Sequence, residues 1–472
     1  MRRIAFPLLA LISLTYLAAA ATRPHYGGTL RAAVQSAPMT LEFPAETNPT
    51  DYRAMSRILL LVGDSLVTID AEDRPHPALA NAWAHDATMR HWELTLRHGV
   101  KFHDGTSASP TVIAQMLAAL HPDWKVYPSS VSAGVRISPD GSIGDSITIE
   151  TEPPNPSLLT ELALPRNLIL SRTTSGIPIG TGPFRVTDFQ PSKHLKLAAV
   201  EDCWSGRPFL DAIEIELGES PRDQAVALEL GRVDLIEAAP RTVNSSARFH
   251  TSLPVELLAL VFPPNSKAQD AHLREVLALS IDRKPIQSVL LKGAGEPTAT
   301  LLPNWMTGYG AAFSTQSNIK RAKTLLAESQ QSPLTLSYDP RDPQSQLIAE
   351  RIALNARDAG ITVQVSLSGA ADLRLVRLAL PSPDPALALR EMARQLSLPQ
   401  PMLRGNTVDD LYPAERGLLD RGAVIPLFHL PVASAVGSSV RGWAPDLLGE
   451  WKLADVWLAD SRAMDSRPGD SR

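Results

Sequence analysis

The tetrapeptide Gly63-Asp64-Ser65-Leu66 contains the serine of this chain that could act as a nucleophile. A serine hydroxyl attacks a carbonyl only when a base lies within hydrogen-bond reach and a third group orients that base. An Asp-x-x-His pair can supply both groups, and the chain offers Asp73 and His76. This pair follows Ser65 by only eight residues. Serine hydrolysis is therefore one hypothesis to weigh.

The same tetrapeptide resembles the opening block of the GDSL serine esterases. That resemblance implies an Asp-x-x-His near the end of the domain and a helix after the serine. Asp73 and His76 lie too close to Ser65 for that order, and residues 67–70 are expected to continue as strand and turn. A secreted GDSL-type esterase that uses Ser65 stays as the alternative hypothesis, not the preferred one.

Five histidines fall close together in the sequence, at His76, His85, His91, His98 and His103. A metal site needs two or more ligands on one face, for example four residues apart on a helix. We expect these histidines on separate strands and turns, so the sequence predicts no metal site and no cofactor. Nickel that arrives already chelated stays open as a cargo.

Length, charge and cysteine content narrow the class of protein. A chain of 472 residues suits about two to three domains. Its 45 basic and 50 acidic residues nearly balance, so its charge gives no reason to expect a nucleic-acid partner. Cys203 is the single cysteine, which excludes an intramolecular disulfide and a cysteine metal site.

The first residues are typical of a secretory signal peptide. Arg2 and Arg3 precede the apolar stretch 4–17, and small residues follow at 18–21. This stretch is short for a membrane span, so a membrane anchor is the less favoured interpretation. We expect a signal peptide at 1–21 and a soluble, periplasmic mature protein.

The spacing of apolar and turn-forming residues predicts an α/β chain. Strands are expected at 28–34 and in the apolar run 58–68, which ends in a turn. Ser109 as N-cap and Pro110 as the first helical residue predict a helix over 110–120. Strand 334–338, helix 344–359 and strand 361–367 form a predicted βαβ unit.

Seven short blocks lie in order along the chain. They are Gly27-Gly28-Thr29-Leu30; residues 77–83, PALANAW; residues 96–105, LRHGVKFHDG; residues 179–184, IGTGPF; residues 204–208, WSGRP; Leu273-Arg274 with Ile281-Asp282-Arg283; and residues 424–427, VIPL. Their order and spacing resemble the family 5 extracellular solute-binding proteins, the receptors of peptide, opine and nickel ABC importers. The resemblance covers roughly residues 26–445.

This resemblance implies an α/β, two-lobed periplasmic-binding-protein fold of type II, with an extra subdomain inserted in the first lobe. The implied first lobe spans 22–255 and contains the subdomain at about 45–165. The second lobe spans 256–425, residues 426–460 return to the first lobe, and 461–472 form a flexible tail. Two crossings between lobes imply hinged closure on a ligand. The implied protein is a monomer that binds its ligand without catalysing a reaction. It delivers this ligand to the permease subunits of an ABC importer.

The resemblance also suggests which residues line the cleft. From the first lobe we expect Glu42 and Asp64; from the second we expect Trp305, Pro381, Arg404, Gly405 and Asn406. Peptide-binding members carry an aspartate for the peptide amine where this chain has Pro381, although Asp384-Pro385 is present. We therefore expect weak binding of free peptides, and Arg404 suggests an anionic or carbonyl-rich ligand. A transport-inactive binder or sensor with the same fold stays open.

Overall fold

The structure is a computed structural model that describes residues 24–43, 49–70, 73–129, 145–238, 247–326, 333–367, 371–403 and 405–459. The expected signal peptide, the expected tail and Arg404 lie outside these residues. In this part of the chain, no helix is both long and apolar enough to cross a membrane.

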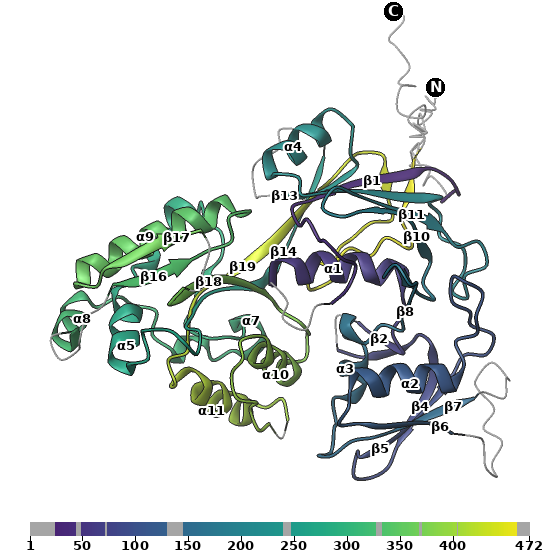
Figure 1. The fold of residues 1–472 in the computed structure, drawn as a ribbon, viewed down its shortest axis with the longest axis horizontal. Helices are drawn as coiled ribbons and strands as arrows, with labels where there is room; N and C mark the ends of the chain where they lie inside the picture. Colours follow the sequence, from purple (N-terminus) through teal and green to yellow (C-terminus); the bar gives the residue numbers. More distant parts are fainter. Residues whose placement is uncertain are drawn as a thin grey trace, which may run out of the picture.

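One sheet of eleven strands passes through both lobes (Figure 1). Its order is β10-β11-β12-β1-β13-β19-β14-β18-β16-β17, with β15 paired to β19. The strands are β1 (Thr29–Val34), β10 (Phe184–Gln190), β11 (His194–Ala199), β12 (Ala212–Leu217), β13 (Leu235–Ala238), β14 (Arg248–Val261), β15 (Glu296–Pro297), β16 (Leu334–Ser337), β17 (Val363–Ser366), β18 (Leu373–Ala379) and β19 (Val424–Val436).

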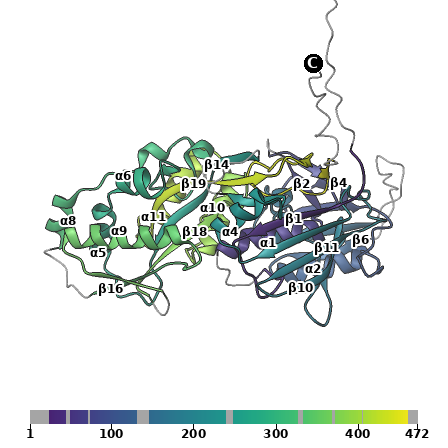
Figure 2. The same ribbon diagram turned by 90° about the horizontal axis from the view of Figure 1, so that it is seen from above.

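Helices cover this sheet and fill the second lobe, which forms one end of the molecule when seen from above (Figure 2). The first lobe contributes α1 (Pro49–Val62) and α4 (Pro221–Glu229). The second lobe contributes α5 (Ala271–Ser280), α6 (Arg283–Pro285), the π-helical turn η2 (Ile286–Leu290), α7 (Asn304–Thr307), the 3₁₀ turn η3 (Gly310–Ala312), α8 (Ile319–Leu326), α9 (Pro343–Ala359), α10 (Pro385–Gln395) and α11 (Val408–Leu419).

A separate four-stranded sheet, of order β4-β5-β7-β6, forms the inserted subdomain. Its elements, with the short strands around them, are β2 (Val67–Ile69), β3 (Pro75–Pro77), β4 (Ala80–His85), β5 (His91–Leu96), α2 (Pro110–Leu120), β6 (Lys125–Ser129), β7 (Ser146–Glu150), α3 (Leu158–Leu162), the 3₁₀ turn η1 (Pro165–Asn167), β8 (Ser171–Arg172) and β9 (Pro178–Ile179). The returning segment adds β20 (Val440–Arg441) and β21 (Trp457–Leu458).

Each of these parts has its own apolar core. The first-lobe core includes Met55, Ile58 and Leu61 of α1, together with strands β1 and β12 and the returning segment. The inserted subdomain buries its own cluster between its sheet and α2. Two further clusters lie on the helical layers of the second lobe. The residue limits expected for the lobes and subdomain remain predictions.

Two long antiparallel strands, β14 and β19, cross between the lobes. They pair from Arg248 opposite Val436 to Val261 opposite Val424. Near the middle of this ladder Pro254 lies opposite Pro431, and the register shifts on both sides of Pro254. Because proline has no N–H group, neither residue can donate a ladder hydrogen bond there. The two prolines therefore interrupt the ladder hydrogen bonds at this point of the crossing.

The expected strand over the apolar run 58–68 is wrong in its first part, because residues 49–62 form α1. The buried side chains Met55, Ile58, Leu59 and Val62 lie at the i, i+3, i+4, i+7 spacing of one helix face. The neighbouring leucines at 60 and 61 make the stretch uniformly apolar, which hides that period. A short apolar run cannot by itself separate strand from helix.

Other local predictions are confirmed. Helix α2 spans the expected residues 110–120, and the Ser109 hydroxyl accepts from the Val112 N–H at 3.4 Å. Strands β16 and β17 pair in parallel on either side of α9, as a βαβ unit requires. Both helices begin with a proline in the first turn, and α9 is also followed by a glycine, Gly360.

Two glycines in the block 179–184 let the inserted subdomain approach α1 closely. The Gly182 N–H donates to the Val62 carbonyl at 2.9 Å, and a Cβ at Gly180 would lie 2.0 Å from that oxygen. His103, from the block 96–105, donates its backbone N–H to the Gly180 carbonyl at 2.9 Å. This block is a junction that only glycine permits, not a nucleotide-binding loop.

Replacing Gly180 with alanine is expected to destabilise the protein, because the added Cβ overlaps a backbone carbonyl that cannot rotate away. We expect a loss of about 1–3 kcal/mol or more in the free energy of unfolding, measured by urea titration. Gly417→Ala is the matched control. It lies in α11 with open space around its Cβ, so alanine there should stabilise by about 0.5–1 kcal/mol. Equal effects of the two changes would contradict this account of the junction.

Candidate functional site

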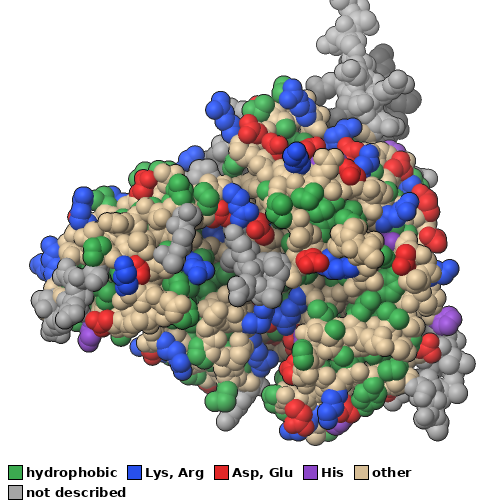
Figure 3. All heavy atoms as spheres, viewed as in Figure 1, with side chains coloured by type: hydrophobic (Ala, Val, Ile, Leu, Met, Phe, Trp, Pro, Cys, Tyr) green, Lys and Arg blue, Asp and Glu red, His purple; other side chains and the backbone are tan. Residues whose placement is uncertain are grey.

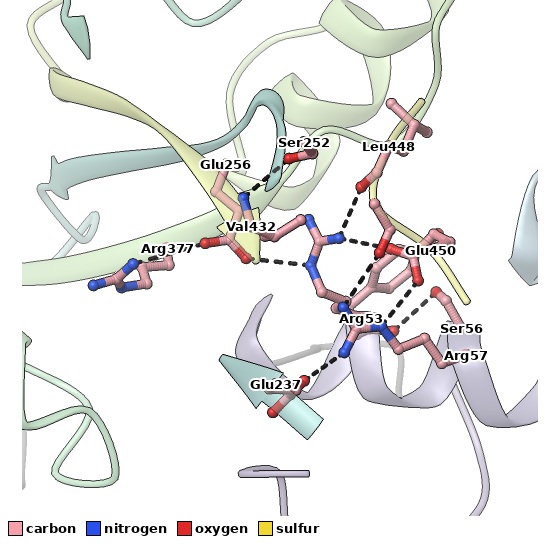
Figure 4. Close-up of polar contacts among 12 residues, drawn as sticks. Arg53, Ser56, Arg57, Glu237, Ser252, Glu256, Arg377, Val432, Leu448 and Glu450 are labelled. Atoms are coloured by element: carbon pink, nitrogen blue, oxygen red, sulfur yellow. Dashed lines mark hydrogen bonds and ion pairs between the residues drawn. The ribbon is translucent and has the colours of Figure 1, made fainter. Parts of the chain in front are cut away.

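Two arginines on α1 lie at the centre of a buried ion network at the crossing between the lobes (Figure 4). Arg53 is 6% exposed and donates to Glu256 of β14 at 3.2 Å and to Glu450 of the returning segment at 2.8 Å. It also donates to the Leu448 carbonyl at 2.9 Å. Burial alone would lower the pKa of Arg53, but the charges of Glu450 and Glu256 outweigh it and raise that pKa.

Arg57, one turn further along α1, extends this network within the first lobe. It pairs with Glu237 of β13 at 2.5 Å and with Glu450 at 3.4 Å, and its guanidinium lies 4.4 Å from the centroid of the Trp451 ring. Burial raises the pKa of Glu450, and the two arginines act against that rise. Buried charges are tolerated only when they are paired in this way.

On the second-lobe side, Arg377 of β18 continues the same network. It lies 3.7 Å from Glu256 and 2.7 Å from Asp342, the residue that caps α9. Next to it, Arg341 contacts Asp51 of α1 at 2.9 Å and Asp339 at 2.7 Å. The hydrogen bond with Asp339 is the largest influence that raises the pKa of Arg341. The Asp51–Arg341 pair thus joins the first turn of α1 to the second lobe.

A further ion pair joins the inserted subdomain to the second lobe. Arg166 of η1 contacts Glu391 of α10, whose side chain is 8% exposed. Burial alone would lower the pKa of Arg166, but Glu391 outweighs it and raises that pKa. Tyr52 of α1 lies near both charges, and burial raises the pKa of its phenol to about 12. Basic side chains gather beside the furrow between these two parts of the molecule (Figure 3).

Two further carboxylates, Asp384 in the second lobe and Asp73 in the inserted subdomain, are coupled through their charges. Asp384 is buried, caps α10 by accepting from the Leu387 N–H at 2.7 Å, and accepts from the Asn406 amide at 2.8 Å. Asp73, between β2 and β3, has φ 59° and a buried carboxylate oxygen without a hydrogen-bond partner among the described residues. Burial, and then the charges of Asp384 and Asp70, raise the pKa of Asp73 to about 6.

The two first-lobe residues expected in the cleft lie apart from this region of contacts. Glu42 is exposed and its carboxylate lies 3.4 Å from Arg172. Asp64 accepts from the Thr181 hydroxyl at 2.9 Å and from the Trp204 indole at 2.8 Å. Burial raises the pKa of Asp64. Both residues have partners within the first lobe, and their role in ligand binding remains a prediction.

Trp305 and Asn406, two of the second-lobe residues expected in the cleft, have hydrogen-bond partners within the protein. The Trp305 indole donates to the Pro254 carbonyl at 2.8 Å, beside the proline pair of the crossing strands. Pro381 is buried between β18 and α10. The Asn406 side chain accepts from the Ala386 N–H at 2.8 Å, and Gly405 precedes it. Arg404 lies outside the described residues, so its ligand-binding role, like the others, stays a prediction.

Ser65 does not have the surroundings of a nucleophile. Its side chain is 5% exposed, and its hydroxyl donates to the Val67 carbonyl at 2.6 Å. His76 instead contacts Asp70 at 2.8 Å, on the exposed β2–β3 hairpin. The expected strand at 67–69 is present as β2. Nothing in the arrangement supports the esterase alternative.

The five histidines between residues 76 and 103 lie mainly on the strands and turns of the inserted subdomain. His85 and His91 are on β4 and β5, and His103 contacts the Gly182 carbonyl at 2.9 Å through its ring. Among the residues that the structure describes, no group of three or more His, Cys, Asp or Glu side chains is placed to hold a metal ion.

Sequence reasoning missed the residues that meet between the lobes, namely Tyr52, Arg166 and Glu391. Arg166 follows Leu164-Pro165, a local pattern that signals only the end of a helix. Its partner Glu391 lies far along the chain, and a single sequence carries no signal for such a pairing. Only the amphipathic pattern of α1 could have placed Tyr52 and Arg53 on the side away from the first-lobe core.

Two lobes with separate apolar cores, joined by crossing strands and by ion pairs, are the architecture of a two-lobed binding protein. A model of the bacterial extracellular solute-binding proteins, family 5 Middle, matches residues 74–388, more than half of the chain. The chain belongs to this family, as its seven blocks suggested.

Individual relatives agree with this assignment. The chain is 24% identical over 352 residues to the nickel-binding protein NikA of Staphylococcus aureus, a match that covers 69% of each protein. The crystal structure of that NikA with Ni(L-His)2 superposes with a TM-score of 0.72 at 18% identity, covering 91% of this chain and 99% of the other. A dipeptide-binding protein from Pseudoalteromonas sp. SM9913, in complex with Met-Leu, gives a TM-score of 0.75 at 16% identity, covering 91% and 100%. These structures show the type II two-lobed fold.

The raised pKa of Asp73 predicts a pH-dependent stability. A carboxyl with an unfolded pKa of about 3.9 and a folded pKa of about 6 binds its proton more tightly in the folded state. Stability from this group is therefore greatest below about pH 4 and is lost as the pH rises through about 6. Asp73→Asn should be relatively more stable than the native protein above pH 6, with the difference disappearing below pH 4.

Thermal unfolding of both proteins between pH 4 and 8 measures this difference. Asparagine suits the left-handed backbone at this position. Asp358→Asn, at an exposed site of α9, controls for loss of one negative charge. Parallel pH profiles for the native protein and Asp73→Asn would contradict a raised pKa of Asp73 in the folded protein.

Proposed function

We propose that this protein is the solute receptor of an ABC importer. It captures a small solute between its lobes by hinge closure and passes it to the permease subunits. The observation that carries this proposal is the set of ion pairs that join the lobes around the N-terminal half of α1, opposite a proline-paired crossing. Membership of the solute-binding family supports it. Ligand and receptor associate without making or breaking a covalent bond.

In this proposal the protein acts as a monomer in the periplasm, after removal of a signal peptide at 1–21. The periplasmic nickel-binding protein of Escherichia coli, 25% identical over 342 residues, supports that location. This assignment includes no cofactor.

The proposed ligand carries a carboxylate or another anionic group. Arg166 faces the second lobe, where its counter-ion across the interface is a glutamate of the protein itself. A guanidinium in such a place suits a planar anionic group. Pro381 offers no side-chain acceptor for a peptide amine, so free dipeptides should bind weakly. The relatives are named for nickel and for dipeptides, so ligand class must be tested for this chain directly.

Calorimetry with two ligand pools tests this proposal. We expect binding from a pool of small carboxylates and their metal chelates, and little from a pool of free di- and tripeptides. Arg166→Met should weaken the observed binding about tenfold to a hundredfold, because a charged hydrogen bond contributes about 1.5–3 kcal/mol. Arg222→Met, exposed on α4, is the control. Submicromolar binding of ordinary dipeptides would overturn the ligand class.

A second experiment separates receptor from enzyme. Because the Ser65 hydroxyl is buried and bonded to its own strand, Ser65→Ala should leave turnover of short-chain p-nitrophenyl esters at the level of the native protein. Release of nitrophenol is followed by absorbance, with the folded state of the variant checked by circular dichroism. Ester hydrolysis that is present in the native protein and lost in this variant would favour the esterase instead.

A further inference from the structure

The contact between Arg166 and Glu391 has a feature that a permanent ion pair does not need. Each partner has a second counter-ion in its own part of the molecule. Arg166 lies 3.0 Å from Glu161 of the inserted subdomain, and Glu391 lies 3.1 Å from Arg394 on its own helix. Separation of the lobes would therefore leave neither charge without a partner.

The Asp51–Arg341 contact is built in the same way. On the first-lobe side, the Ser36 hydroxyl donates to Asp51 at 2.5 Å. On the second-lobe side, Arg341 holds both carboxylate oxygens of Asp339. An ion pair whose members keep local partners can break and re-form without exposing an unpaired buried charge, which is the usual obstacle to opening such a contact.

The crossing strands allow that movement. The Pro254–Pro431 pair removes ladder hydrogen bonds at one point, and the register shifts beside it. Bending at this point would carry α10 and the Arg341 turn away from α1 and η1, while Arg57 stays with Glu237 and Glu450 inside the first lobe. The Arg53–Glu256 pair also spans the crossing, and each partner has a counter-ion on its own side, Glu450 for Arg53 and Arg377 for Glu256. The Arg57 pairs lie within the first lobe.

We propose that Glu391 is a built-in substitute for the ligand: its carboxylate occupies Arg166 and, with the Asp51–Arg341 pair, holds the lobes together when no solute is bound. This inference rests on the proposed function, because it assumes that Arg166 receives the anionic group of the solute. A ligand then binds by displacing Glu391, and the receptor rejects solutes whose anion competes poorly with a glutamate carboxylate. The closed ligand-free state lowers apparent affinity by the fraction of open molecules.

The test measures the distance between the lobes in the ligand-free protein, so it does not depend on knowing the ligand. The mature protein, unfolded and refolded to remove bound solute, carries spin labels at Asp123→Cys and Asp409→Cys in a Cys203→Ser background. Both labelled positions are exposed, one on the inserted subdomain and one on α11. In the protein with all its native ion pairs, double electron–electron resonance should give a single short distance between the two spin labels.

Glu391→Gln should shift most molecules to a longer distance, and the charge-swapped Arg166→Glu/Glu391→Arg protein should restore the short one. Glu275→Gln, which removes an ion pair with Arg321 inside the second lobe, is the matched control and should leave the distance short. Asp51→Asn provides a second opening variant should Glu391→Gln fail to fold. A long distance in the unmodified ligand-free protein, or the same short distance in every variant, would overturn the inference. Failure of the proposed function would instead appear as absent binding in calorimetry with the distance pattern intact.

Discussion

Burial of two guanidinium groups on α1 is the constraint on which the rest of this structure depends. Arg53 and Arg57 are each less than one tenth exposed, and taking such charges out of water costs several kcal/mol unless carboxylates surround them. Those carboxylates come from three distant passages of the chain: Glu237, Glu256 and Glu450. The arginines can be buried only when β13, β14 and the returning segment meet at α1. The same requirement places the helix at the crossing between the lobes, with its N-terminal half facing the second lobe.

The charged contacts around α1 fall into two groups with different consequences. Arg57, Glu237 and Glu450 belong to the first lobe and its returning segment, so they stabilise one body whatever the lobes do. Asp51, Arg53 and Arg166 reach across to the second lobe, where Arg341, Glu256 and Glu391 meet them. Apolar cores hold each lobe together, but the interface between lobes is charged. A charged interface with local partners on both sides is suited to opening and closing, whereas a large apolar one would not be.

Sequence reasoning found the fold because the family blocks mark backbone geometry that few residues allow. Gly180 and Gly182 are present because no side chain fits against the end of α1, and His103 contacts the same turn. Arg283, in another block, is buried and donates to the Pro426 carbonyl at 2.8 Å, within the last block. Because such blocks contact each other in the folded protein, their order along the chain indicates the fold. The site was harder to predict, because Arg166 and Glu391 carry no local pattern and α1 was hidden within a uniformly apolar run. Pro381 is buried, and Asn406 has hydrogen-bond partners within the second lobe.

Native mass spectrometry of the mature protein, purified without unfolding from the periplasm of its own host, tests the central claim most directly. The account predicts one small molecule bound non-covalently to each chain, carrying an anionic group and lost from the Arg166→Met protein. A chain that consistently carries no small molecule, or one that carries a covalent acyl group on Ser65, would contradict it.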